Sequence, residues 1–263
     1  MNVEARGLTV RFGRHAAISG IDLRMATGEV LAVVGPNGSG KSTLLRALAG
    51  IVAHTGRVTW DGDGSVAADN VGYMPQDNAL RAMLTAFEVV LLGRMRSLSF
   101  RVAPADLAAA AAAFDELGIG DLAERRIGEL SGGQRQLVFL AQVLAGNPRV
   151  LLLDEPTSAL DIAHQLQVLQ MLRAVTRRRA LTTLVVLHDL NAAARHADRV
   201  ALLDRGKLVE IGTPAVVLRP DALRAAFGIE TAILEGPNGH LVVVPLGVTS
   251  PAPSEAASMV GAS

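Results

Sequence analysis

The sequence contains no cysteine among its 263 residues, and only 3% of the residues are aromatic. The absence of cysteine excludes disulfides and thiolate metal sites, and it fits a reducing compartment. Hydrophobic residues nevertheless make up 50% of the chain, so alanine, valine and leucine must supply most of a sizeable core. This length suits one large α/β domain with an insertion, or two small domains.

The sequence also lacks an excess of positive or of negative residues. Lysine and arginine together number 25, as do aspartate and glutamate, whereas a duplex-binding protein usually carries a basic excess or stripe. We therefore expect no nucleic-acid partner. The single basic run, Arg177 to Arg179, is interpreted as the solvated end of a helix.

Long hydrophobic runs are missing as well. No uncharged apolar run approaches the roughly 20 residues that cross a bilayer. The first residues, "MNVEARGLTVRFG", lack the apolar core of a signal peptide. We expect a soluble chain that works at a membrane only through partners.

The hydrophobic pattern that is present predicts a parallel α/β core. Apolar or alternating runs predict strands at 3–12, 29–35, 57–60, 71–74, 149–156, 182–189, 199–204 and 207–212. The last two strands should form a hairpin across Arg205 and Gly206. Helices are predicted at 41–50, which Gly50 closes in a left-handed cap, at 162–173, and from 190 onward.

A helical insertion interrupts this core between about residues 84 and 145. Its clearest helix covers 104–118, where Pro104 suits the first turn. The apolar stripe expected on this helix consists of Leu107, Ala110, Ala111, Phe114 and Leu117. The core domain is expected to span 1–230. Residues 231–263 should add two short strands around a turn at 236–239 and then a flexible tail.

The stretch "GPNGSGKST" lies between an apolar strand and a helix. It fits G-x-x-x-x-G-K-[ST], in which the glycines let backbone N–H groups wrap phosphates and the helix amino terminus adds its dipole. Lys41 should reach the β- and γ-phosphates, and the Ser42 hydroxyl should ligate Mg²⁺. The predicted phosphate-binding residues are Gly35, Pro36, Asn37, Gly38, Ser39, Gly40, Lys41, Ser42 and Thr43.

Two carboxylates follow the buried strand in "VLLLDEP". The carboxyl ends of strands are where open α/β sheets bind ligands. Asp154 should hold Mg²⁺ directly or through water, and Glu155 should orient or deprotonate the attacking water as a general base. The pair alone would fit an ordinary helix start, but together with the glycine loop it predicts nucleotide hydrolysis.

Three further residues gain meaning from this context. His188 follows a strand that should lie beside the other two, which favours a γ-phosphate contact over an ordinary surface or core histidine. Gln76 is either a polar loop residue or a group that senses Mg²⁺ and the attacking water. Phe12 either belongs to the core or stacks on adenine, a contact that would contribute about 0.5–1.5 kcal/mol.

A second glycine-rich polar stretch, "LSGGQ", begins at Leu130, and "SALD" ends at Asp161. Together with "GPNGSGKST", "PQ", "LLLDEP" and the histidine of "LHDL", these motifs occur in the order and spacing of ABC transporter ATP-binding subunits. The chain resembles that family over about residues 3 to 230.

The resemblance implies a P-loop NTPase (RecA-like) core with an antiparallel β subdomain, an inserted α-helical subdomain, and a site for ATP and Mg²⁺. It also implies a sandwich dimer with a second copy of the chain. Asp161 would lie across that interface. The residues that would meet the γ-phosphate held by the other copy are Ser131, Gly132, Gly133 and Gln134.

Further partners are implied by the same resemblance. Transmembrane permease subunits would dock near residues 76–96, and an extracytoplasmic substrate-binding protein would deliver the substrate. The chain would then lie peripherally on the cytoplasmic face of the cell membrane.

Closer details resemble the ATPases of iron–siderophore, haem and cobalamin importers, namely "LLGR", "LDIAHQ", "LHDLNAAARHADRV" and "VVPLG". Two details depart from that pattern. The stretch from Trp60 to Gln76 is short, with "VGYMPQ" closer to manganese and zinc importers, and Met95 stands where a proline often follows "GR".

Two other classes of protein share the same motifs, namely efflux ATPases and soluble ABC ATPases that act on ribosomes or DNA. The soluble class usually carries two cassettes or a long coiled-coil insertion.

Overall fold

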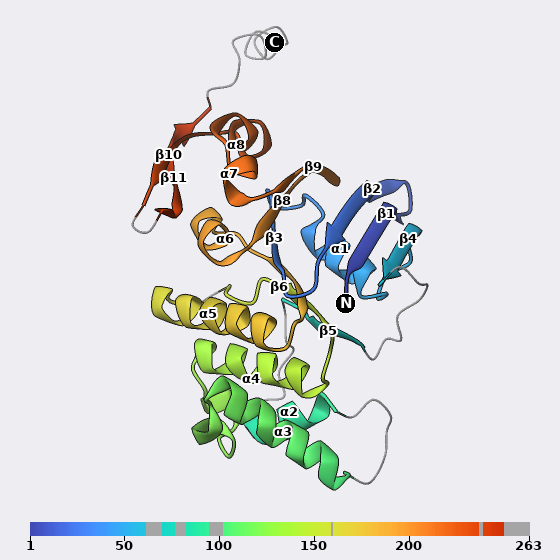
Figure 1. Ribbon diagram of the computed structural model, residues 1–263, viewed down its shortest axis with the longest axis vertical. Helices are drawn as coiled ribbons and strands as arrows, with labels where there is room; N and C mark the ends of the chain where they lie inside the picture. The colour runs from blue at the N-terminus through green and yellow to red at the C-terminus, as the bar shows by residue number, and fades with distance from the viewer. Residues whose placement is uncertain (62–69, 77–82, 95–101, 159, 237–238, 250–263) are drawn as a thin grey trace, which may run out of the picture.

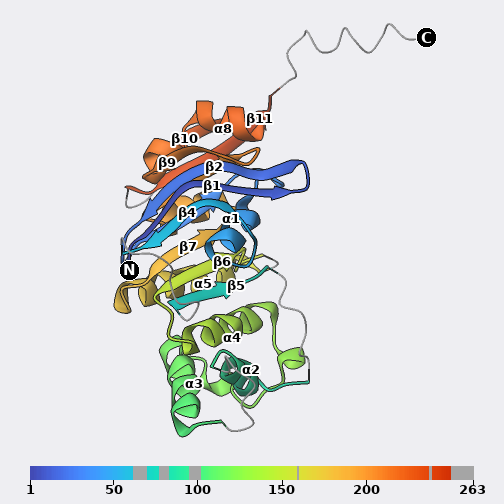
Figure 2. The same cartoon turned by 90° about the vertical axis from the view of Figure 1, so that its right-hand side faces the viewer.

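The chain folds in layers around a central sheet, as a computed structural model shows (Figures 1 and 2). The structure describes residues 1–61, 70–76, 83–94, 102–158, 160–236 and 239–249. Helices cover one face of the central sheet, and a helix with a second, antiparallel sheet covers the other face. None of the helices in the described ranges is long and apolar enough to cross a membrane.

Within the described residues the central sheet has the strand order β5-β6-β7-β3-β8-β9. Its strands are β3 (Val30–Val34), β5 (Val71–Met74), β6 (Val150–Asp154), β7 (Thr182–Val186), β8 (Arg199–Asp204) and β9 (Lys207–Gly212). All neighbours are parallel except β8 and β9, which form the predicted hairpin. Parallel strands end at one edge of the sheet, so the turns after β3, β5, β6 and β7 meet there.

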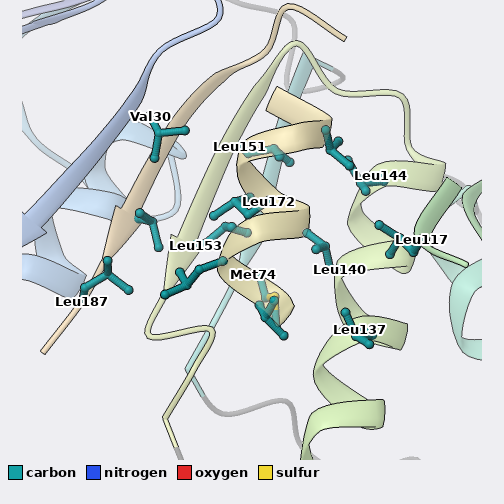
Figure 3. Close-up of a cluster of buried hydrophobic side chains, with 14 of the residues drawn as sticks. Val30, Met74, Leu117, Leu137, Leu140, Leu144, Leu151, Leu153, Leu172 and Leu187 are labelled. Atoms are coloured by element: carbon teal, nitrogen blue, oxygen red, sulfur yellow. The ribbon is translucent and has the colours of Figure 1, made fainter. Parts of the chain in front are cut away.

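Both faces of the sheet are buried, which explains the unbroken apolar runs in its strands. In β3, Val30, Ala32 and Val34 belong to one hydrophobic cluster, whereas Leu31 and Val33 belong to the other. The first cluster joins the sheet to the helices of its face, α4 (Gly132–Ala145), α5 (Ile162–Arg178) and α6 (Leu190–His196). Figure 3 shows leucines of β6, α5 and α4 meeting in this cluster.

The second face packs against α1 (Lys41–Leu48) and an antiparallel sheet of order β2-β1-β4. The strands of that sheet are β1 (Val3–Phe12), β2 (His15–Met25) and β4 (Thr55–Trp60). No strand was expected at β2, although Ile21, Leu23 and Met25 are buried and alternate with exposed residues. This period of two was the signal for the missing strand.

The predicted helical subdomain contains α2 (Ala86–Leu92), α3 (Pro104–Leu117), the 3₁₀ turns Gly120–Leu122 and Ile127–Glu129, and α4. The stripe expected on α3 was wrong at two positions, because Leu107 and Ala111 are exposed. The buried positions are Ala110, Ala113, Phe114 and Leu117. A run of six alanines carries no clear hydrophobic phase, so packing against α2 and α4 decides which face is buried.

Helix α5 ends at Arg178 rather than at the predicted Arg173. The arginine run closes the helix as predicted, and Arg177 and Arg178 are exposed there, but the run also forms ion pairs with other elements. Arg178 and Arg179 both pair with Glu116 of α3, and Arg177 Nη2 lies 2.5 Å from Asp198 Oδ1. The run therefore ties the helical subdomain to the core domain.

Two short helices, α7 (Pro214–Val217) and α8 (Pro220–Phe227), lead from β9 to the C-terminal hairpin. This hairpin consists of β10 (Ile229–Glu235) and β11 (Leu241–Val248), which pair in antiparallel fashion as predicted. The predicted tail from residue 250, Met95, and Ala159 of "SALD" lie outside the described residues.

Candidate active site

The phosphate loop (Gly35–Thr43) connects β3 to α1, as the sequence predicted. Two of its glycines have no room for a side chain. A Cβ on Gly35 would lie 2.1 Å from the Leu203 carbonyl oxygen, and one on Gly40 would lie 2.6 Å from Ile18 Cγ2. Gly40 also has a left-handed φ of 101°, which favours glycine. The loop is therefore wedged between β2 and the β8–β9 hairpin.

Lys41 lies inside this loop. Its Nζ atom donates to the carbonyl oxygens of Gly35 and Pro36, both at 2.9 Å. The residue is only 6% exposed, and this burial lowers the pKa of the Lys41 ammonium against the opposing influence of Glu155 and Asp154. A buried cation held by two neutral carbonyls can turn toward a bound phosphate.

Ser42 and Asp154 meet across the carboxyl edge of the sheet. The Ser42 hydroxyl donates to Asp154 Oδ1 at 2.9 Å, while Asp154 Oδ2 is buried and has no hydrogen-bond partner among the described residues. Burial raises the pKa of the Asp154 carboxyl, and the Ser42 hydrogen bond opposes this rise. A hydroxyl and an unsatisfied carboxylate oxygen form the hard oxygen donor set that Mg²⁺ prefers. The residues present therefore fit Mg²⁺, which would neutralise phosphate charge when bound.

Glu155 is held by partners from two other strand ends. Gln76 Nε2 donates to Glu155 Oε2 at 2.7 Å, and His188 Nε2 lies 2.5 Å from Glu155 Oε1. The strand order places β7 between β6 and β3, so His188 lies beside the other two strand ends as expected. The Glu155 backbone has a left-handed φ of 51°, a strain on the order of 1–3 kcal/mol that often marks functional sites. A carboxylate so placed can orient a water molecule and accept its proton.

These side chains open into one hollow of about 670 Å³. Its lining combines residues of the phosphate loop with three polar side chains from the other strand ends. The lining residues are His15, Ala17, Asn37, Gly38, Gly40, Lys41, Ser42, Thr43, Gln76, Glu155 and His188. His15 and Ala17 were not foreseen, because they belong to the unpredicted strand β2.

Phe12 lies at the tip of the β1–β2 hairpin, opposite His15. The residue is 56% exposed, so the interpretation as a core phenylalanine was wrong. It does not line the hollow but stands beside a residue that does. An exposed ring in this place can cover a base that extends from the hollow.

The signature stretch (Leu130–Gln134) lies elsewhere in the chain. Ser131 caps α4 by accepting from the Gln134 N–H at 3.3 Å, and the Gln134 side chain accepts from the Ser131 N–H at 3.1 Å. Ser131 is exposed. None of the four residues Ser131, Gly132, Gly133 and Gln134 is among the described residues that line the hollow.

Asp161 caps α5 next to the signature stretch. Its carboxylate accepts from the His164 N–H at 2.9 Å and lies 2.8 Å from His164 Nδ1. These hydrogen bonds, the backbone bond first, hold the pKa of the Asp161 carboxyl below its usual value. The His164 ring packs so closely on Gly133 that a Cβ there would lie 2.4 Å from His164 Cδ2. Gln165 Nε2 donates to the Leu160 carbonyl at 3.1 Å, so "LDIAHQ" fixes the approach to α5.

Comparison with known proteins identifies the family. The model of the family described as ABC transporter matches residues 18–158. The chain is 44% identical to the hemin import ATP-binding protein HmuV of Myxococcus xanthus, over 92% of this chain and 97% of that protein. It is 36% identical to the ferric enterobactin transport ATP-binding protein FepC of Escherichia coli, over 93% and 94% of the two chains.

A solved structure agrees with the sequence relatives. It is described as an inward-facing conformation of a putative metal-chelate type ABC transporter. One of its chains superposes with a TM-score of 0.82 at 28% identity, over 93% of this chain and 97% of that chain. The chain therefore belongs to the ABC transporter family and is an ATP-binding protein with ATPase activity.

Proposed function

We propose that this chain is the ATP-hydrolysing subunit of an importer, and that the imported compound is haem, a ferric siderophore or cobalamin. The observation that carries the proposal is the full-length similarity to a hemin import ATP-binding protein, at 44% identity over 97% of that protein. The similarity to FepC extends the same class to a ferric siderophore. The chain would lie on the cytoplasmic face of the membrane, bound to permease subunits. An extracytoplasmic binding protein would deliver the substrate to these permease subunits.

Within one site, the candidate residues in and beside the hollow have separate roles. Lys41 binds the β- and γ-phosphates once nucleotide replaces the two carbonyl partners of its ammonium. Ser42 and Asp154 hold Mg²⁺, with Gln76 as a further oxygen ligand. Glu155 is the general base. His188 contacts the γ-phosphate, and Phe12 stacks on the adenine.

The other half of each site comes from a second copy of the chain. Helix α4 is 14 residues long and begins at the signature stretch, with an exposed Ser131 hydroxyl. Free N–H groups and the positive end of the dipole at such a helix start favour a phosphate. The signature lies away from the hollow of its own chain, so a partner's γ-phosphate is the group that it would meet. Asp161, adjacent to it, would then lie at the same interface.

The relatives favour haem and iron chelates over the manganese and zinc alternative that the short Trp60–Gln76 segment raised. Residues 62–69 of that segment lie outside the described residues. So do 77–82 and 95–96 of the region where a permease helix should dock. The Arg94 end of that region is anchored by an ion pair between Arg94 Nε and Asp106 Oδ1 at 3.0 Å.

The test is uptake by the organism that carries the gene. A strain without the gene should lose growth on haem as the only iron source, and the unchanged gene should restore it. The Glu155→Gln variant should bind ATP and assemble with its partners but fail to restore growth, because the amide cannot accept the proton from water. Normal haem, siderophore and cobalamin use together with a loss of manganese or zinc uptake would contradict the proposed substrate class.

A further inference from the structure

A second cavity is lined by residues of α5, α6 and the C-terminal hairpin. Helix α6 contacts both α5 and β11 and lies between α5 and the hairpin in Figure 1. It has a volume of about 440 Å³ and is lined by Gln170, Arg173, Ala174, Arg177, Arg195, His196 and His240. None of these residues lines the active-site hollow. Arg173 lies 11 residues after Ile162, the first residue of α5, which places it roughly 16 Å along the helix from Ile162 at about 1.5 Å per residue. We call this space the basic cavity.

The basic cavity holds more positive than negative charge. Asp198 pairs with Arg177 at 2.5 Å and more loosely with Arg173 at 3.8 Å. Arg195 has no acidic partner among the residues that the structure describes. Its backbone carbonyl accepts instead from Arg173 Nη1, at 3.3 Å. Among the described residues, Asp198 thus pairs with two of the three guanidinium groups of the cavity, and Arg195 lacks a carboxylate partner.

His196 is the buried group that this charge surrounds. It is 7% exposed, and its Nε2 atom is buried with no hydrogen-bond partner in the described chain. Burial lowers the pKa of His196, and the positive charges of Arg195, Arg173 and His240 lower it further, with Asp189 acting in the opposite direction. A buried polar atom without a partner is costly.

The C-terminal hairpin closes one side of this cavity. The Asn191 side chain of α6 pairs with the backbone of Val243, through Nδ2 to the carbonyl oxygen at 3.1 Å and from the Val243 N–H to Oδ1 at 2.7 Å. These two hydrogen bonds attach β11 to α6. His240 precedes β11 and lines the cavity from the hairpin side. A ligand here would contact three elements at once.

We propose that the basic cavity binds a phosphate-type oxyanion, which bridges α5, α6 and the C-terminal hairpin. Guanidinium forks match the oxygens of phosphate in bidentate geometry. Arg195 and Arg173 supply such forks, and His240 adds a contact from the hairpin. The anion neutralises the excess positive charge that surrounds the His196 ring.

The test uses the whole chain saturated with ADP and Mg²⁺, so that the phosphate loop is already filled. Inorganic phosphate is titrated at constant ionic strength, with thermal unfolding as the readout. The unfolding midpoint should rise to a plateau in the unchanged chain. In Arg195→Gln the apparent affinity should fall about tenfold or more, because a charged hydrogen-bonding partner is lost. Arg57→Gln, at an exposed arginine of β4, is the matched control and should behave as the unchanged chain.

Nuclear magnetic resonance of the histidine rings provides the second readout, since it does not depend on stability. Phosphate should shift the ring resonances of His196 and raise its pKa toward the ordinary value. These changes should be absent in Arg195→Gln. Equal phosphate titrations in all three proteins would mean a general salt effect and would overturn the proposal. So would a His196 ring that phosphate leaves unchanged.

Discussion

Glu155 and Gly133 show two kinds of residue that a functional site needs. Glu155 is polar, follows a strand, and meets Gln76 and His188 from neighbouring strand ends. Its place followed from the sequence, because the carboxyl ends of parallel strands share an edge. Gly133 matters for the opposite reason, since it leaves space for the His164 ring.

Gly133→Ala should therefore impair the enzyme through a clash. A Cβ would lie 2.4 Å from His164 Cδ2, and overpacking of this kind costs about 1–3 kcal/mol. We expect kcat for ATP hydrolysis to fall about tenfold as the signature stretch shifts. The ring is held by Asp161, so it cannot simply turn away.

The double variant Gly133→Ala, His164→Ala separates this explanation from a loss of glycine itself. Removal of the ring should restore most of kcat, while His164→Ala alone should have a smaller effect. If the double variant is as slow as Gly133→Ala, the contact between the two residues is not the cause.

The positions of the candidate site residues could be predicted where the signal lies in a short stretch of sequence, whereas their roles stay predictions. The loop spacing placed Lys41 and Ser42, and the strand ends placed Asp154, Glu155 and His188. The contact of Gly133 with His164 could not be predicted, because 31 residues separate them and only the packing of α4 on α5 brings them together. The orphan nitrogen of His196 also depends on tertiary packing and has no local signal.

Helix α2 approaches α4 closely at Gly93, the glycine of "LLGR". A Cβ on Gly93 would lie 1.9 Å from the Gln142 carbonyl oxygen, which is backbone and cannot rotate away. Gly93→Ala should push α2 from α4 and lower the free energy of unfolding by about 2 kcal/mol or more.

Gly120→Ala is the matched control for this substitution. Gly120 lies in the same subdomain, has no described atom within 4 Å of the added Cβ, and lacks a left-handed φ. Urea unfolding followed by circular dichroism should show little change for Gly120→Ala and a clear loss for Gly93→Ala. Equal midpoints for the two variants would contradict the close approach of α2 and α4.

Elements with strong periodicity were predicted well, and those that depend on context were not. The strands of the central sheet and the β8–β9 hairpin follow from apolar runs and turn residues. The buried face of the alanine-rich helix α3 was predicted wrongly at two positions, since alanine is compatible with burial and exposure alike. The end of α5 was placed too early because its arginines find partners in other elements, Glu116 and Asp198.

At the scale of the whole molecule, the phosphate loop and the signature stretch lie on different elements, and only the first lines the hollow. This separation supports the proposal that one chain carries half of each of two sites. Sequence alone implied the dimer only through family resemblance. The most direct test of this central claim mixes two defective chains.

The experiment uses Lys41→Ala and Ser131→Arg, both on a Glu155→Gln background that keeps bound ATP unhydrolysed. Each homodimer has two defective sites. The Lys41→Ala homodimer lacks the cation of the phosphate loop in both sites, and the Ser131→Arg homodimer has a bulky cation at the signature in both. In the mixed dimer both defects fall on one site, and the other pairs an intact loop with an intact signature. Purified mixed dimers, selected with two affinity tags, should retain about one ATP per dimer after rapid gel filtration, whereas either parent retains little. Mixed dimers that retain no more ATP than the parents would show that the signature does not serve the partner's loop and would contradict the shared site.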